Sequence, residues 1–131
     1  MKYILLLLAL VSLPAIAEGP IVDPTRQATK PLTCVLPTEY TDNTPLDPLN
    51  INRVNFYRAQ AVSGPWTLIG SNLGPICAYT EQVNLLAVGQ YYYHATVTDN
   101  IGLESGMSNI VPLEVRLSVP PKPPTSLGWA D

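Results

Sequence analysis

Apolar and polar side chains alternate along most of the sequence, as expected for β-strands with one buried face. The clearest case is the segment 90–99, where successive side chains fall into two rows on opposite faces. Fourteen prolines and eight glycines interrupt the chain too often for a sustained helical period. We therefore predict an all-β domain. The expected strands are 32–36, 51–58, 66–70, 76–81, 90–99 and 109–117.

Two segments flank this alternating region, which we expect to form one domain over residues 31–117. Residues 18–30 are polar and contain proline, so they predict an extended lead-in with at most one short strand A around Ile21 and Val22. Residues 118–131 form a proline-rich tail of the kind that adopts polyproline II and acts as a stiff spacer. Trp129 either packs back onto the domain or is the exposed tip of a tail that docks elsewhere.

Pro112 lies inside the last expected strand. Proline has no N–H group to donate to a ladder, so it is confined largely to the edges of sheets. We therefore expect the strand 109–117 to lie at an edge.

The first seventeen residues predict a signal-peptide helix. Lys2 provides the positive charge, residues 4–13 the apolar run and residues 15–17 a small-x-small cleavage pattern, so cleavage is expected before Glu18. An uncleaved anchor is the alternative, but a membrane span needs about 20 apolar residues and Pro14 interrupts this run. We expect a secreted or periplasmic protein without stable membrane insertion.

Composition narrows the functional classes. The chain has seven basic and ten acidic side chains, and the basic ones are scattered, so no nucleic-acid footprint is indicated. No zinc spacing, glycine-rich phosphate loop or Gly-x-Ser-x-Gly motif is present, and we expect no cofactor. Cys34 and Cys77 in an exported chain indicate one disulfide, with two buried free thiols as the alternative.

Two longer segments resemble fibronectin type III domains of bacteria and phages. Residues 32–59 are similar to the B-strand, B–C loop and C-strand of that family, and residues 86–115 to its E–F corner, F-strand, F–G loop and G-strand. The resemblance implies an immunoglobulin-like, seven-stranded β-sandwich.

The resemblance also implies roles for three residues. Cys34 stands where the family usually has a core tryptophan on strand B, and Cys77 falls on the inward face of strand E, its sheet neighbour. A Cys34–Cys77 disulfide would then replace the aromatic residue as the tie across that sheet. Tyr91 follows "LAVG" and resembles the tyrosine-corner residue, whose hydroxyl group bonds to nearby backbone.

His94 is the first candidate for catalysis because histidine titrates near neutral pH. Alternation places Tyr91 and Tyr93 in the core and Tyr92 and His94 towards solvent, and no local pattern supplies His94 with a catalytic partner. We therefore assign no catalytic residue and expect no enzyme.

Four acidic residues in loops are candidate calcium ligands: Asp42 with Asp47, and Asp99 with Glu104. Neither pair has the spacing of a calcium loop, and turns themselves favour aspartate. We predict no metal site. Nothing in the sequence indicates the pair of carboxylates that a glycosidase needs on either side of a cleft.

A surface pattern remains as the candidate site. Strands 51–58 and 90–99 are expected to present one mixed face, for which a plain solvated surface is the alternative reading. The lead hypothesis is a non-catalytic adhesion or protein-interaction module of a bacterium or phage, with an unknown protein or surface glycan as partner. The alternatives are a structural subunit of a virion or appendage that docks by its tail or an edge strand, and a glycan-associated accessory domain or hydrolase. The expected face consists of Arg53, Asn55, Tyr57, Tyr92, His94 and Thr96.

Overall fold

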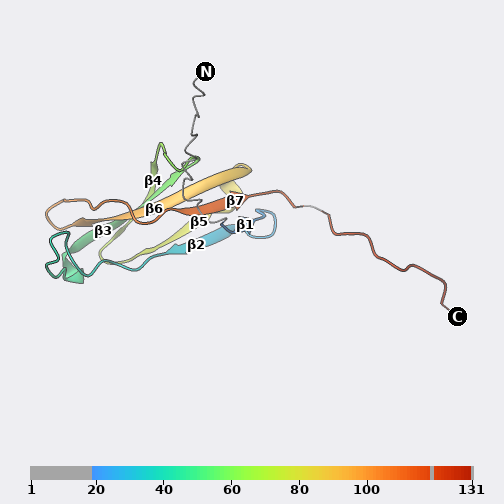
Figure 1. The fold of residues 1–131 in the computed structure, drawn as a ribbon, viewed down its shortest axis with the longest axis horizontal. Coiled ribbons are helices and arrows are strands. Elements are labelled where there is room, and N and C mark those ends of the chain that lie inside the picture. Colours follow the sequence, from blue (N-terminus) through green and yellow to red (C-terminus); the bar gives the residue numbers. More distant parts are fainter. Residues whose placement is uncertain (1–18, 119, 131) are drawn as a thin grey trace, which may run out of the picture.

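The computed structural model describes residues 19–118 and 120–130. The predicted signal peptide, residues 1–17, lies outside the described residues. The described part forms two packed sheets, with strand orders β1-β7-β6-β3-β4 and β2-β5 (Figure 1). This arrangement confirms the predicted all-β sandwich. Its elements are β1 (Ile21–Val22), β2 (Thr29–Thr33), η1 (Pro48–Asn50), β3 (Ile51–Ala59), β4 (Thr67–Leu73), β5 (Ala78–Gln82), η2 (Val83–Leu85), β6 (Gly89–Asp99) and β7 (Val111–Val115).

The core lies between the two sheets and follows the predicted alternation. Val54 and Phe56 on β3 are fully buried, and Tyr91 and Tyr93 on β6 are buried beside Leu113. The partly buried Leu32 and Ile69 pack against both groups of core residues, so the interior is continuous along the sandwich. Strand alternation therefore identified the inward row of both long strands.

The disulfide joins β2 to β5, as the resemblance implied. Cys34 and Cys77 are bonded, with their Cα atoms 5.3 Å apart, and the Cys34 N–H donates to the Cys77 carbonyl oxygen at 3.3 Å. Both cysteines lie just beyond the strand ends, because β2 covers Thr29–Thr33 rather than the predicted 32–36. Backbone N–H groups along a strand point alternately to its two edges. Since the Cys34 N–H points towards β5, the Pro31 nitrogen faces the outer edge of β2, where a missing donor is tolerated.

The expectation that Pro112 marks an edge strand is wrong. β7 lies between β6 and β1, and β1 runs parallel to it. The backbone N–H groups of Glu114 and Arg116 donate to the carbonyl oxygens of Pro20 and Val22, at 3.0 and 2.9 Å. The Pro112 nitrogen also faces the edge of β7 that pairs with β1. It lies before the first of these hydrogen bonds, so its missing N–H breaks no bond to β1.

The backbone before β1 passes very close to Pro112. A Cβ atom at Gly19 would lie 2.1 Å from the Pro112 carbonyl oxygen. Gly19 therefore allows a contact that no larger residue could make without displacing the chain.

The segment before β7 remains beside β6 although it is not a strand. Ser105 and Ser108 donate their backbone N–H groups to Val97 and Ala95, at 2.8 and 2.9 Å. Their hydroxyl oxygens accept the N–H groups of the same two residues, at 3.0 and 2.9 Å. These serine side chains complete the ladder where the backbone is irregular.

The proline-rich tail leaves the sandwich after β7 and extends away from it (Figure 1). Leu127 and Trp129 are fully exposed, at 99% and 101%. Trp129 therefore does not pack back onto its own domain. Among the described residues no helix is long and apolar enough to cross a membrane.

Candidate binding face

The predicted polar row lies on the face of the five-stranded sheet opposite the core, where β3 and β6 run side by side. Tyr57 is directly opposite His94, and Asn55 is directly opposite Thr96. Facing pairs on neighbouring strands have side chains close enough to touch. The strand register therefore brings four of the six predicted residues together.

A glutamate from the β6–β7 loop anchors this row. Glu104 Oε2 accepts hydrogen bonds from Tyr57 OH at 2.8 Å, Asn55 Nδ2 at 3.0 Å and Thr96 Oγ1 at 3.1 Å. We call Asn55, Tyr57, Thr96 and Glu104 the outer cluster. Burial and the neighbouring Glu104 carboxylate raise the pKa of Tyr57, which keeps its hydroxyl group protonated as a donor.

His94 is enclosed by aromatic rings. Its ring stacks on Tyr57 with centroids 4.7 Å apart and meets Trp66 edge-on at 4.4 Å. The residue is only 7% exposed, and within the described part of the chain its buried Nδ1 has no hydrogen-bond partner. Burial lowers the pKa of His94, so the ring is neutral at pH 7.

The expectation that His94 points into solvent is therefore wrong, and Asn55 and Thr96 are buried as well. Alternation predicts the face of a strand but not what covers that face. Here Trp66, immediately before β4, covers His94, while Glu104 lies over Asn55 and Thr96. The sequence pattern places Trp66 in an expected strand without indicating that it covers His94, and it suggests only a metal-ligand role for Glu104.

The accessible part of the face is aromatic and cationic. Tyr57, Trp66 and Tyr92 are half-buried, and Arg53 is exposed. Arg53 and Tyr92 are therefore accessible to another molecule. These four residues form what we call the aromatic face.

The other three acidic candidates for calcium binding stabilise turns. Asp42 accepts the Thr44 N–H at 3.0 Å, and Asp47 caps η1 by accepting the Leu49 N–H at 3.0 Å. Asp99 accepts two backbone N–H groups of the loop that follows it, at 3.1 and 2.9 Å. These contacts are the turn contacts that aspartate commonly makes.

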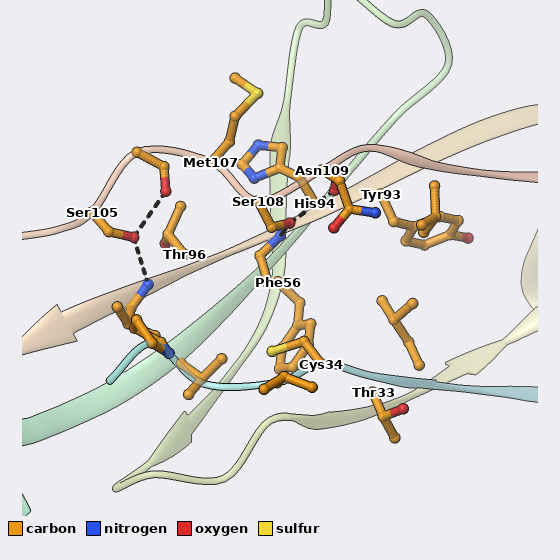
Figure 2. A pocket seen from close by; sticks show the side chains of 18 residues that line it. Thr33, Cys34, Phe56, Tyr93, His94, Thr96, Ser105, Met107, Ser108 and Asn109 are labelled. Carbon is orange, nitrogen blue, oxygen red and sulfur yellow. Dashed lines mark hydrogen bonds between the residues drawn. The ribbon is translucent and has the colours of Figure 1, made fainter. Parts of the chain in front are cut away.

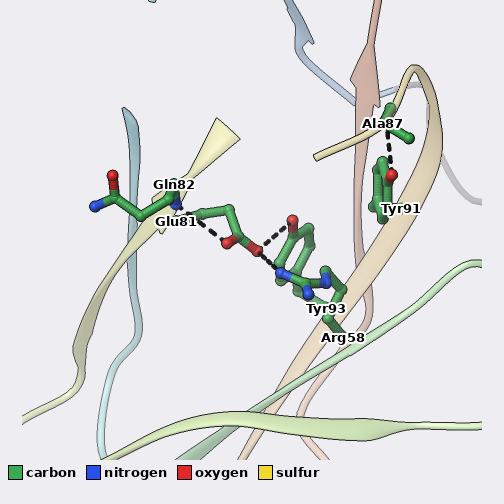
Figure 3. A network of polar contacts seen from close by, with 6 residues as sticks. All are labelled: Arg58, Glu81, Gln82, Ala87, Tyr91 and Tyr93. Atoms are coloured by element: carbon green, nitrogen blue, oxygen red, sulfur yellow. Dashed lines mark hydrogen bonds and ion pairs between the residues drawn. The ribbon is translucent and has the colours of Figure 1, made fainter. Parts of the chain in front are cut away.

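A second polar group lies between the sheets (Figure 3). Glu81 Oε2 accepts hydrogen bonds from Arg58 Nη1 and Tyr93 OH, each at 2.7 Å. We call Arg58, Glu81 and Tyr93 the inner cluster. Burial and then Glu81 raise the pKa of Tyr93, and Glu81 raises the pKa of Arg58 although burial alone would lower it. The cluster links β3, β5 and β6 across the core.

Near the inner cluster, Tyr91 makes the contact of a tyrosine corner. Its hydroxyl group donates to the Ala87 carbonyl oxygen, four residues earlier, at 2.7 Å. Figure 3 shows this bond at the start of β6. It fixes the chain where it enters the strand.

A groove of about 640 Å³ opens along the side of the sandwich. Thr33 and Cys34 lie along one side and Ser105 and Ser108 along the other, with Phe56 between them (Figure 2). The lining residues carry no charged side chain. The groove therefore suits an uncharged, largely apolar occupant.

No protein-family model and no curated protein sequence matches this chain. Among solved structures, the crystal structure of a Fn3-like protein from Clostridium thermocellum is similar to it. The two share 24% sequence identity with a TM-score of 0.49, over 77% of this chain and 90% of that chain.

Proposed function

We propose that the protein is a non-catalytic interaction module that acts outside the cytoplasm and binds a partner protein through the aromatic face. The observation that carries this proposal is that Tyr57 is fixed from two sides, by its bond to Glu104 and by its stack on His94. Tyrosine, tryptophan and arginine are enriched among the residues that dominate binding energy. A ring that is already held in place loses little conformational entropy on binding.

The surroundings of the ionisable groups favour binding over catalysis. The two rings against His94 belong to Tyr57 and Trp66, rather than to a nucleophile that His94 could activate. Glu81 and Glu104 are each engaged by several donors. These contacts give the histidine and both glutamates structural roles that require no catalysed reaction.

Export is supported by two features of the chain. The N-terminal segment has the pattern of a signal peptide, and Cys34 and Cys77 form a disulfide. Disulfides persist mainly in oxidising compartments. We therefore propose a secreted or periplasmic location.

Affinity capture with a double substitution tests the proposed function. Tyr57→Ala with Tyr92→Ala should reduce capture of the partner from the native envelope at least about tenfold, because interface tyrosines are common hot spots. The matched control is Leu49→Ala with Leu85→Ala, which changes two exposed residues of η1 and η2 instead of β3 and β6. Circular dichroism confirms that both variants are folded. Undiminished capture by the tyrosine variant would refute the proposal, and loss upon treating the envelope with glycosidases would identify a glycan instead of a protein.

The exposed tail favours a second candidate, a structural subunit of a virion or surface appendage. Leu127 and Trp129 are large apolar side chains without any cover from their own domain. Apolar groups presented on an extended segment are typical of peptides that dock into a groove or onto a sheet edge. This candidate makes self-assembly, rather than capture of a foreign partner, the primary activity.

A further inference from the structure

The groove lies beside the start of β7, where β1 does not pair with that strand. β1 pairs with β7 at Glu114 and Val115 and extends no further towards the start of that strand. Beyond this point Thr33–Val35 and Ser105–Asn109 lie on opposite sides of the groove. Within residues 19–118 and 120–130, no segment closes the space between them.

One side of the groove carries backbone groups suited to pairing with a strand. Cys34 directs its N–H towards Cys77, so strand alternation directs that of Thr33, the last residue of β2, outwards. The Val35 side chain is 96% exposed. An added extended segment would therefore gain main-chain hydrogen bonds and cover an apolar side chain.

The tail has the complementary chemistry. Residues 123–130 carry no charge and include Leu127 and Trp129, both fully exposed. The groove lining is likewise uncharged. Tryptophan has the largest apolar surface of the amino acids and gains most from entering such a groove.

The tail is directed away from its own groove. It leaves the domain at the C-terminal end of β7, whereas the groove lies beside the residues that precede β7. Prolines 120, 121, 123 and 124 make the intervening segment a stiff, extended spacer. To reach its own groove the chain would have to reverse through this spacer, so a second copy is the better acceptor.

We propose that the segment Leu127–Trp129 of one copy occupies the groove of a second copy, where it pairs as an added strand beside Thr33–Val35. This inference rests on the structural-subunit candidate and names its docking site. The contact is heterologous, because the tail of one molecule meets the groove of the next. Such contacts produce open chains or closed rings of copies.

Two single variants and their mixture test the proposal. The full chain is expressed with its own leader in a bacterial export host, so that processing and disulfide formation can occur. Trp129→Ala removes the tail anchor, and Val35→Asp places a charge in the groove at an exposed position where folding should be unaffected. Lys122→Ala, a change in the tail spacer, is the matched control.

Light scattering across a concentration series gives the expected result. Wild type and Lys122→Ala should grow in mass with concentration, whereas each single variant should show self-association weakened at least about tenfold. Mixing the two variants should produce a one-to-one pair that grows no further, since the pair combines one intact groove with one intact tail.

Three outcomes would overturn the inference: a wild type that stays monomeric at all concentrations, a Trp129→Ala variant that assembles like wild type, or a mixture that forms no pair. In a Trp66→Phe background, where Trp129 is the single tryptophan, a blue-shifted emission that does not depend on concentration would show docking within one molecule and would also overturn it. Capture through the aromatic face is read out separately. A monomer that still captures its partner refutes only this inference, whereas an assembling protein that captures none refutes only the module proposal.

Discussion

The inner and outer clusters use similar chemistry in different surroundings. In each, one glutamate oxygen accepts hydrogen bonds from a tyrosine hydroxyl group and from at least one nitrogen donor. Glu81 is 4% exposed and lies between the sheets, whereas Glu104 lies on an exposed loop above the outer face. Burial therefore decides what such a glutamate cluster does. A buried cluster links the two sheets, whereas an exposed one holds surface side chains in position.

Removing the inner carboxylate should have the larger effect. Glu81→Ala leaves the Arg58 guanidinium and the Tyr93 hydroxyl group without their acceptor inside the sandwich. Breaking a buried ion pair by deleting one partner typically costs about 3–5 kcal/mol, and we expect the lower end because Arg58 is 28% exposed. Urea denaturation measures the change in the free energy of unfolding.

Glu114→Ala is the matched control for that measurement. Glu114 pairs with Arg116 at 2.9 Å, but both side chains are accessible to solvent, at 36% and 54%. Exposed pairs contribute roughly 0–1 kcal/mol. If Glu81→Ala costs no more than this control, the inner cluster is not a structural tie.

Removing the outer carboxylate should lower the free energy of unfolding by less, and its effect should be confined to the neighbouring loop. In Glu104→Ala water can replace the lost acceptor at the accessible Tyr57 hydroxyl group, so we expect a loss of about 1 kcal/mol. Hydrogen exchange should accelerate at residues 103–106, because Glu104 anchors that loop to the sheet. The exchange of β5 should be unchanged. Equal acceleration in both regions would show that the two clusters are not independent.

The smallest effect concerns pH and His94. Burial places its pKa in the fold below the ordinary 6.5, so the unfolded chain binds the proton more readily. Stability should therefore fall as the pH drops below about 6.5. The facing Glu104 opposes this shift without reversing it.

His94→Gln should remove this part of the pH dependence, whatever its effect on absolute stability. The measurement is the slope of unfolding free energy against pH between about 5 and 7. Asp23 and Asp42, whose pKa values in the fold are lowered by hydrogen bonds from Thr25 and Thr44, contribute only at lower pH, below 3.8. Identical slopes for wild type and variant would contradict the account of His94.

The comparison also shows which features the sequence could predict. Alternation assigned Val54 and Phe56 to the core and Tyr57 and His94 to the opposite face. Alternation is a local property, so it cannot specify which distant segment covers a face. Trp66 reaches His94 from the residue before β4, and its effect on burial follows only from the folded chain.

The strand ends show a second limit. Apolar alternation over 32–36 suggested a strand there, yet β2 ends at Thr33 and begins at Thr29. Pro31 fits inside β2 because its nitrogen lies on the outer edge. Which edge a proline faces depends on the pairing partner, which the sequence of one strand does not contain. The same reason explains the wrong edge assignment for Pro112.

The parallel pairing of β1 with β7 also constrains the order of folding. It joins the two ends of the domain, and the hydroxyl groups of Thr25 and Ser118, 93 positions apart, meet at 3.2 Å beside it. Contacts between such distant residues slow folding because a long loop must close before they form. During synthesis the first strand therefore has no partner until almost the whole domain has been made. Its two residues should be among the last to gain protection when the chain matures.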